Sequence, residues 1–164
     1  MLVRLNSKAI ADELMALSAL RAVARGDDGS QPLLTRDSLP GLRVVMRMVF
    51  AEALLGLGDF VEDCGIDGED PELPLPYDEG DVLLLEVSLR DGPAGAMPSG
   101  KALAVKRHLE HVVAAGTLGW VATDADASFA ELLQREREGA LVALKETLAA
   151  TDMDAAACVR PGWP

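Results

Sequence analysis

The fold of this chain is decided by residues 99–150, whose sequence is SGKALAVKRHLEHVVAAGTLGWVATDADASFAELLQREREGALVALKETLAA. Two amphipathic helical patterns flank the segment Gly119-Trp120-Val121-Ala122-Thr123-Asp124, and nothing in this stretch resembles a reaction centre. In both patterns apolar residues recur three or four positions apart, with charged residues between them. We therefore expect two antiparallel helices joined by a short connection.

The earlier of these helices is expected to begin at Ser99 as its capping residue. Its predicted buried face consists of Ala102, Val105, Leu109, Val112, Val113, Gly116 and Trp120, and its predicted outer positions are Lys101, Lys106, Arg107 and Glu110. Gly116 and Gly119 have no side chain, so another backbone can approach closely there.

The later helix is expected to restart at Thr123 or Asp124. Its predicted inward residues are Phe129, Leu132, Leu133, Ala140, Leu141, Leu144 and Leu148. The charged run over residues 134–138 is interpreted as its solvated face.

Two more helices are expected in the first third of the chain. Asn6 or Ser7 can cap the first, whose apolar residues Ile10, Leu14, Leu17 and Leu20 or Ala24 recur at helical spacing. Ser38 followed by Leu39-Pro40 predicts the start of a second helix over residues 39–62, because proline is tolerated in a first turn. Apolar residues cover well over half of the circumference of that second helix. We therefore expect it to lie centrally in the core or to be shared with another subunit.

Residues 62–81 hold nine carboxylates and three prolines, a composition that cannot sustain a helix. We expect a long acidic loop there, and it lacks the ligand spacing of a calcium loop. The apolar run over residues 81–89 then fits one extended strand. That strand could pair with Leu2-Val3-Arg4-Leu5 or with the same segment of a neighbouring subunit, and the sequence leaves both alternatives open.

The composition supports one helical domain. The chain has 164 residues, 49% of them apolar but only 4% aromatic, which favours a core of Leu, Val, Ala and Met in packed helices. The predicted fold class is mainly α, a four-helix-type bundle with one short β segment and a long acidic loop. We place the domain at residues 1–150 and a C-terminal tail at residues 151–164, where Trp163 is expected to dock on its own subunit or on a neighbour.

Charge and cysteine content restrict the partners and the compartment. A net charge of −12, without a basic stripe, argues against direct binding of nucleic acid or of anionic membranes. Cys64 and Cys158 form no CxxC pair and are interpreted as free thiols. Residues 1–6 lack the order of a signal peptide, and charges interrupt the apolar stretch 44–61, so we expect cytoplasmic synthesis and no membrane span.

The sequence offers no catalytic, cofactor-binding or metal-binding site. His108 and His111 lack the spacing of a zinc protease motif and are interpreted as surface or packing residues. Gly56-Leu57-Gly58 lies in an apolar helix without a following lysine, so it is not a phosphate-binding loop. No serine or cysteine has a recognisable His and Asp framework. We therefore expect a protein that is not an enzyme and uses no cofactor.

The order of elements resembles a family of small, mostly helical prophage proteins of gut bacteria, described as tail-completion or head–tail connector-like proteins. The resemblance covers nearly the whole chain. It depends on Glu52-Ala53-Leu54-Leu55-Gly56-Leu57-Gly58-Asp59-Phe60, on Leu83-Leu84-Leu85-Glu86-Val87, on His111-Val112-Val113-Ala114-Ala115-Gly116-Thr117-Leu118-Gly119-Trp120, on the helix of Phe129 and on the Arg-Pro tail.

The resemblance implies a non-enzymatic particle component that binds neck, portal or tail proteins and copies of itself, and that ends in the virion after cytoplasmic synthesis. The alternative is a cytoplasmic helical adaptor or regulator with one protein partner. In either case the expected assembly contacts are Arg43, Arg47, Leu83, Leu85, Val87, Gly116, Trp120 and Trp163.

Overall fold

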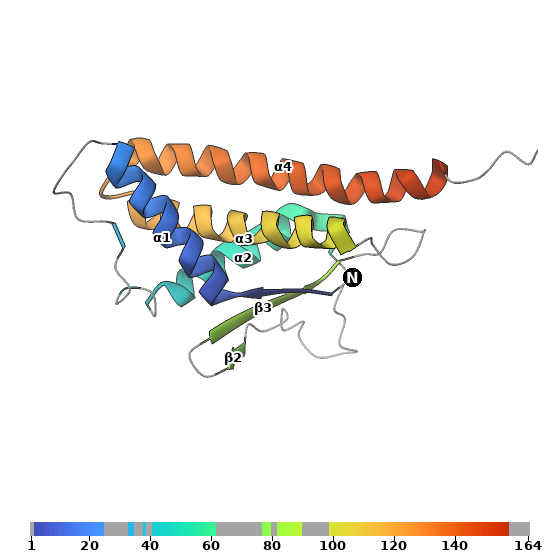
Figure 1. Cartoon of the computed structure of the whole chain (residues 1–164), viewed down its shortest axis with the longest axis horizontal. Helices are drawn as coiled ribbons and strands as arrows, with labels where there is room; N and C mark the ends of the chain where they lie inside the picture. Colours follow the sequence, from blue (N-terminus) through green and yellow to red (C-terminus); the bar gives the residue numbers. More distant parts are fainter. Residues whose placement is uncertain are drawn as a thin grey trace, which may run out of the picture.

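Four helices pack over one face of a small antiparallel sheet (Figure 1). The computed structural model describes residues 2–24, 33–34, 38, 41–61, 77–79, 82–89 and 99–157. The helices are α1 (Ser7–Ala24), α2 (Arg43–Leu57), α3 (Ser99–Ala122) and α4 (Ala127–Ala157), and a short 3-10 helix, η2 (Gly58–Phe60), follows α2. The prediction of a mainly α fold with four helices is confirmed.

The central element is α3, which contacts α1, α2, α4 and the sheet. Its middle residues are buried nearly all around the helix, including Val112, Val113, Ala114, Ala115 and Leu118. Small residues in this run let three helices approach the α3 backbone at once. The second helix was expected to lie centrally in the core or to be shared with another subunit; α2 buries one side within the chain and leaves Val44 and Leu55 exposed, at 73% and 82%.

The sheet has the strand order β1-β3-β2 and is antiparallel throughout. Its strands are β1 (Leu2–Asn6), β2 (Tyr77–Glu79) and β3 (Val82–Ser88). β1 pairs with β3 in a register that aligns Leu2 with Ser88, so the strand predicted over residues 81–89 has a partner within its own chain. Val3 and Leu5 are buried while Leu2 and Arg4 are exposed, as expected for a sheet with one face on the core.

β2 lies inside the stretch predicted to be a loop, and the sheet therefore has more strands than the single segment expected. Within residues 62–81 the structure describes only 77–79, so the rest of the predicted acidic loop lies outside the described residues, as does Cys64.

α2 is shorter than the predicted range 39–62 at both ends, because residues 41 and 42 form a 3-10 turn before Arg43 and Gly58 ends the helix. Gly58 has φ +53°, a conformation that favours glycine, and its N–H donates to the Leu54 carbonyl. η2 then carries the chain out of the helix, and Val61 forms an isolated bridge with Leu89.

The start of α4 corrects the predicted cap. Asp126, and not Thr123 or Asp124, occupies the capping position: its Oδ1 accepts a hydrogen bond from the Phe129 N–H at 3.2 Å. Asp126 is 8% exposed, whereas the other two are exposed and lie in the turn after α3. Asp126 is preferred over Asp124 at this position because it also accepts a hydrogen bond from Arg21 Nε of α1 at 2.8 Å.

Several residues of α3 and α4 depart from the predicted helical faces. Glu110 was expected outside but is 2% exposed, and its carboxylate lies 3.2 Å from Arg107 Nη1 and 4.0 Å from Lys106 Nζ on the same helix. Leu132 and Trp120 were expected inside but are 50% and 58% exposed. α4 remains helical to Ala157, and Trp163 and Cys158 lie outside the described residues.

Candidate protein-binding groove

An open groove of about 470 Å³ lies where α2, α3 and α4 meet. We call it the Trp120 groove; its lining consists of Met48, Val49, Glu52, Gly116, Gly119, Trp120, Thr123, Ala127, Ala130, Glu131, Gln134 and Arg137. Two large apolar side chains belong to this lining and remain open to solvent, Trp120 at 58% and Met48 at 43%. A half-exposed indole beside a half-exposed thioether is a surface that protein interfaces use often.

An ion pair joins α2 to α4 across the groove. Arg137 Nη2 donates to Glu52 Oε2 at 2.8 Å, and the Arg137 side chain is only 14% exposed. Arg137 was predicted to lie on the solvated face of its helix, but residues 133, 137, 144 and 148 follow one another at helical spacing on the packed side. The pair connects the α2 wall of the groove to its α4 wall.

Gly116 is essential to the packing at the base of this groove. A Cβ on Gly116 would lie 2.5 Å from Val49 Cγ1 and 3.2 Å from Arg137 Cδ. One turn further on, a Cβ on Gly119 would meet Leu133 Cβ at 3.6 Å and the Ala130 carbonyl oxygen at 3.9 Å. The predicted close approach at these glycines is therefore realised by helices of the same chain.

Trp120 lies beside these glycines on α3. Its side chain lines the groove and is 58% exposed, whereas Gly116 and Gly119 are closely covered by α2 and α4. Thr123, at the end of the groove, donates its hydroxyl to the Gly119 carbonyl at 2.9 Å. This hydroxyl is engaged in holding the end of its own helix.

A second apolar groove of about 420 Å³ lies on the opposite flank of α4, against α1. Its lining includes Leu17, Leu20, Phe129 and Leu132, with Leu20 at 65% exposed. Both grooves use the first three turns of α4, so exposed apolar residues gather around the end of the bundle formed by the α3–α4 turn.

The structure brings together two of the predicted assembly residues, Gly116 and Trp120, in the Trp120 groove. Arg43 and Arg47 are half-buried on α2 and do not line it. Val87 is buried at 1% within the chain's own core, opposite Val3. Leu85 and Leu83 lie on β3, in register with Leu5 of β1 and Asp78 of β2.

Sequence reasoning missed Met48, Glu52 and Arg137 as members of the groove. Met48 and Glu52 are four residues apart on α2, which is a signal that they share a face. Their meeting with Arg137 depends on how α2 crosses α4, and a single sequence carries no signal for that crossing.

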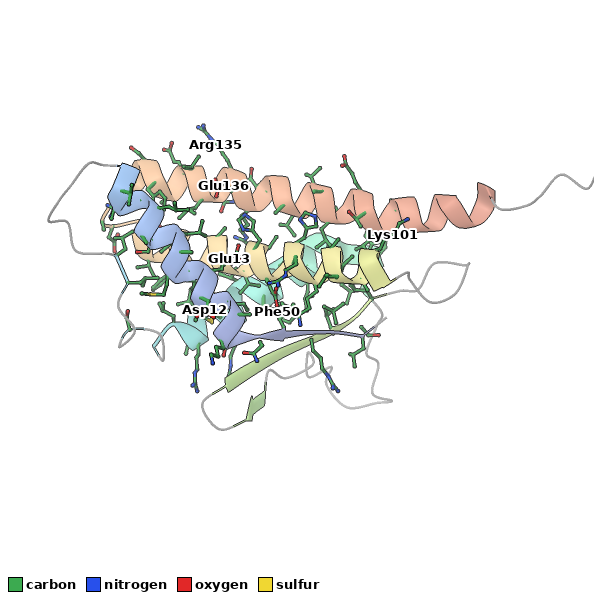
Figure 2. All side chains as sticks on the ribbon, viewed as in Figure 1. Asp12, Glu13, Phe50, Lys101, Arg135 and Glu136 are labelled. Atoms are coloured by element: carbon green, nitrogen blue, oxygen red, sulfur yellow. The ribbon has the colours of Figure 1, made fainter. Side chains whose placement is uncertain are left out.

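His111 is engaged in a packing contact between helices. Its Nδ1 lies 2.5 Å from Glu13 Oε1, which joins α3 to α1. That hydrogen bond raises the pKa of His111, and the negative charges of Glu13 and Glu136 act in the same direction while burial opposes them. Figure 2 shows Glu13 on α1 and Glu136 on α4. His111 thus lies among carboxylates from two other helices.

Within the part of the chain that the structure describes, no group of three or more His, Cys, Asp or Glu side chains is arranged to hold a metal ion. Among those same residues, no helix is long and apolar enough to cross a membrane.

No known protein-family model, curated protein or solved structure matches this chain.

Proposed function

We propose that this protein is a non-enzymatic structural subunit of a phage or prophage particle, of the head–tail connector or tail-completion kind, which assembles through protein–protein contacts. The observation that carries the proposal is the Trp120 groove, in which exposed Trp120 and Met48 provide an apolar contact surface beside the Arg137–Glu52 ion pair. Its partners in this proposal are neck, portal or tail proteins, together with further copies of the chain.

The polar side chains of the groove favour a role in protein assembly over a role in catalysis. Glu52 and Arg137 neutralise each other, and Thr123 donates to its own helix. A reacting group needs a positioned acid, base or nucleophile that is free to act on a substrate. The buried aromatic anchor of an interface needs only shape and apolar surface, and tryptophan is the residue most enriched among such anchors.

The test is capture of partners from the native host after induction of its prophage. The tagged protein is purified both from lysate and from isolated particles, and the recovered proteins are identified by mass spectrometry. We expect portal, neck or tail proteins to be recovered with it. Absence from particles, with stable recovery of a single non-structural protein, would overturn the proposal and indicate a cytoplasmic adaptor.

A matched pair of variants connects this outcome to the groove. Trp120→Ser removes the exposed anchor, and Leu103→Ser removes an apolar side chain of nearly equal exposure, 57% against 58%, elsewhere on the same helix. We expect Trp120→Ser to lower partner recovery by about thirtyfold, as for an interface hot spot, and Leu103→Ser to leave it unchanged. Equal loss in both variants would show that the groove is not the binding surface.

A further inference from the structure

The outer face of α4 carries a regular stripe of exposed residues. We call it the α4 stripe; its members are Leu132, Arg135, Gly139, Val142, Glu146 and Ala149, all of them exposed. They are spaced alternately by three and four residues, which is the spacing of the contact seam between two helices that pack along their length. α4 lies along the outside of the bundle (Figure 1). Its residues Leu133, Leu144 and Leu148 are buried, so the exposed stripe lies on the opposite side of the helix.

We propose that a second copy of this chain packs on the α4 stripe in antiparallel orientation. When the two-fold axis passes midway between Gly139 and Val142, each residue of the stripe faces a complementary one on the second copy. Leu132 faces Ala149 and Gly139 faces Val142, so a large side chain meets a small one in every apolar layer. This alternation is what close packing between helices requires.

The charges of the stripe agree with the same alignment. Arg135 faces Glu146 of the second copy, and by symmetry the pair occurs twice in the dimer. On one flank, Lys145 comes beside Glu138 of the second copy, because equivalent flanks meet when helices are antiparallel. A parallel pair in register would instead bring Arg135 against Arg135 and Glu146 against Glu146, which disfavours that arrangement.

Within one chain, Arg135 of the stripe makes only a weak ion pair. Arg135 lies 4.0 Å from Glu131, and both side chains are about three-quarters exposed, at 77% and 74%. An ion pair of this kind contributes little to stability. In Figure 2 Arg135 projects away from the rest of the fold, into the space that a second α4 would occupy.

The α4 stripe is separate from the Trp120 groove, which uses α4 residues on another side of the helix. The inference deepens the self-association in the proposed function and rests on that part of it. Self-association is measured on the purified protein and partner capture in the induced host, so failure of one is distinguishable from failure of the other.

The test is analytical ultracentrifugation of the full chain over a wide range of concentration. We expect a monomer–dimer equilibrium in the unaltered protein. Arg135→Glu and Glu146→Arg should each raise the dissociation constant by at least about tenfold, since each places two like-charge contacts in the dimer. The double variant Arg135→Glu with Glu146→Arg restores the opposite charges and should return the constant to within about threefold of its original value.

Lys8→Glu is the matched control for Arg135→Glu, because it also replaces a positive charge with a negative one, at an exposed position of α1. It should leave the dissociation constant unchanged. A protein that is monomeric at its highest soluble concentration overturns the proposal. So does a dimer that neither single reversal weakens, or one that the double variant fails to restore while circular dichroism shows intact helices.

Discussion

Arg21 Nε donates a hydrogen bond to Asp126 Oδ2 at 2.8 Å, which joins the last turn of α1 to the residue that caps α4. The Arg21 guanidinium also lies 5.6 Å from the centre of the Phe129 ring, within the range of a cation–π contact. One aspartate thus fixes the ends of two helices at the α3–α4 turn, beside both apolar grooves.

Replacing Asp126 should destabilise the protein by two separable routes. Asp126→Ala loses the cap and the ion pair and should lower the free energy of unfolding by about 2 kcal/mol. Asp126→Asn keeps a capping oxygen and should cost less. Asp124→Ala, an exposed neighbour in the same turn, should cost less than about 0.5 kcal/mol. Urea unfolding followed by circular dichroism measures all three, and equal losses for Asp126→Ala and Asp124→Ala would contradict the assigned cap.

The contact between His111 and Glu13 should make stability depend on pH. The pKa of His111 is raised in the folded protein, mainly by its hydrogen bond with Glu13, so the folded state keeps its proton at a pH where the unfolded state has lost it. This stabilisation is complete below the ordinary histidine pKa of 6.5 and is lost as the pH rises through the folded value. We expect the free energy of unfolding to fall over that interval.

Glu13→Gln is the control for this pH dependence. It removes the charge that favours the protonated imidazole, so the fall in unfolding free energy above the ordinary histidine pKa should become smaller. A slope that is identical in the variant and the unaltered protein would mean that another group is responsible.

Adding one methyl group at Gly116 should strain the contact between α2 and α3. Gly116→Ala places a Cβ 2.5 Å from Val49 Cγ1 and should cost about 1–3 kcal/mol. Gly100→Ala, where nothing lies within 4 Å of the new Cβ, is the matched control and should be nearly neutral. Combining Gly116→Ala with Val49→Ala should cost less than the sum of the two single changes. Strict additivity would show that the two residues do not press on each other.

Replacing leucine with alanine should lower stability far more at a buried position of α3 than at an exposed one. Leu118 is fully buried and Leu103 is 57% exposed on the same helix. Leu118→Ala should lower the free energy of unfolding by about 2–5 kcal/mol, and Leu103→Ala by less than about 0.5 kcal/mol. Thermal and urea unfolding report the difference, and a Leu103→Ala loss comparable with that of Leu118→Ala would place α3 differently in the fold.

The helices could be predicted from sequence because their signals are local. The repeat of Ile10 and Leu14 and the capping residues before it need no knowledge of the rest of the chain. α1 begins at Ser7, and Asn6, one of the two expected caps, accepts a hydrogen bond from the Lys8 N–H at 2.7 Å. The end of α2 at Gly58 also has a local cause, the positive φ of that glycine, yet the apolar pattern continues past it and extended the predicted helix.

The features that could not be predicted from sequence depend on contacts between elements that are far apart in the chain. β2 is too short to give a pattern of its own and is defined by its pairing with β3. Helical periodicity placed Trp120 inside and Glu110 outside, but burial is set by how closely the neighbouring helices approach. Gly116 allows Val49 of α2 and Arg137 of α4 to approach α3 closely, while Arg107 and Lys106 supply the charges that let the Glu110 carboxylate be buried.

The register that aligns Leu2 with Ser88 also imposes an order on biosynthesis. β1 leaves the ribosome first, but its pairing strand and the central helix α3 are made much later, and domains emerge at roughly 5–20 residues per second. For that interval α1 and α2 lack α3, the helix on which both of them mainly pack. Nascent chains of this protein should therefore be substrates of ribosome-associated chaperones until α3 has emerged, and stalling before Ser99 should leave a product that aggregates.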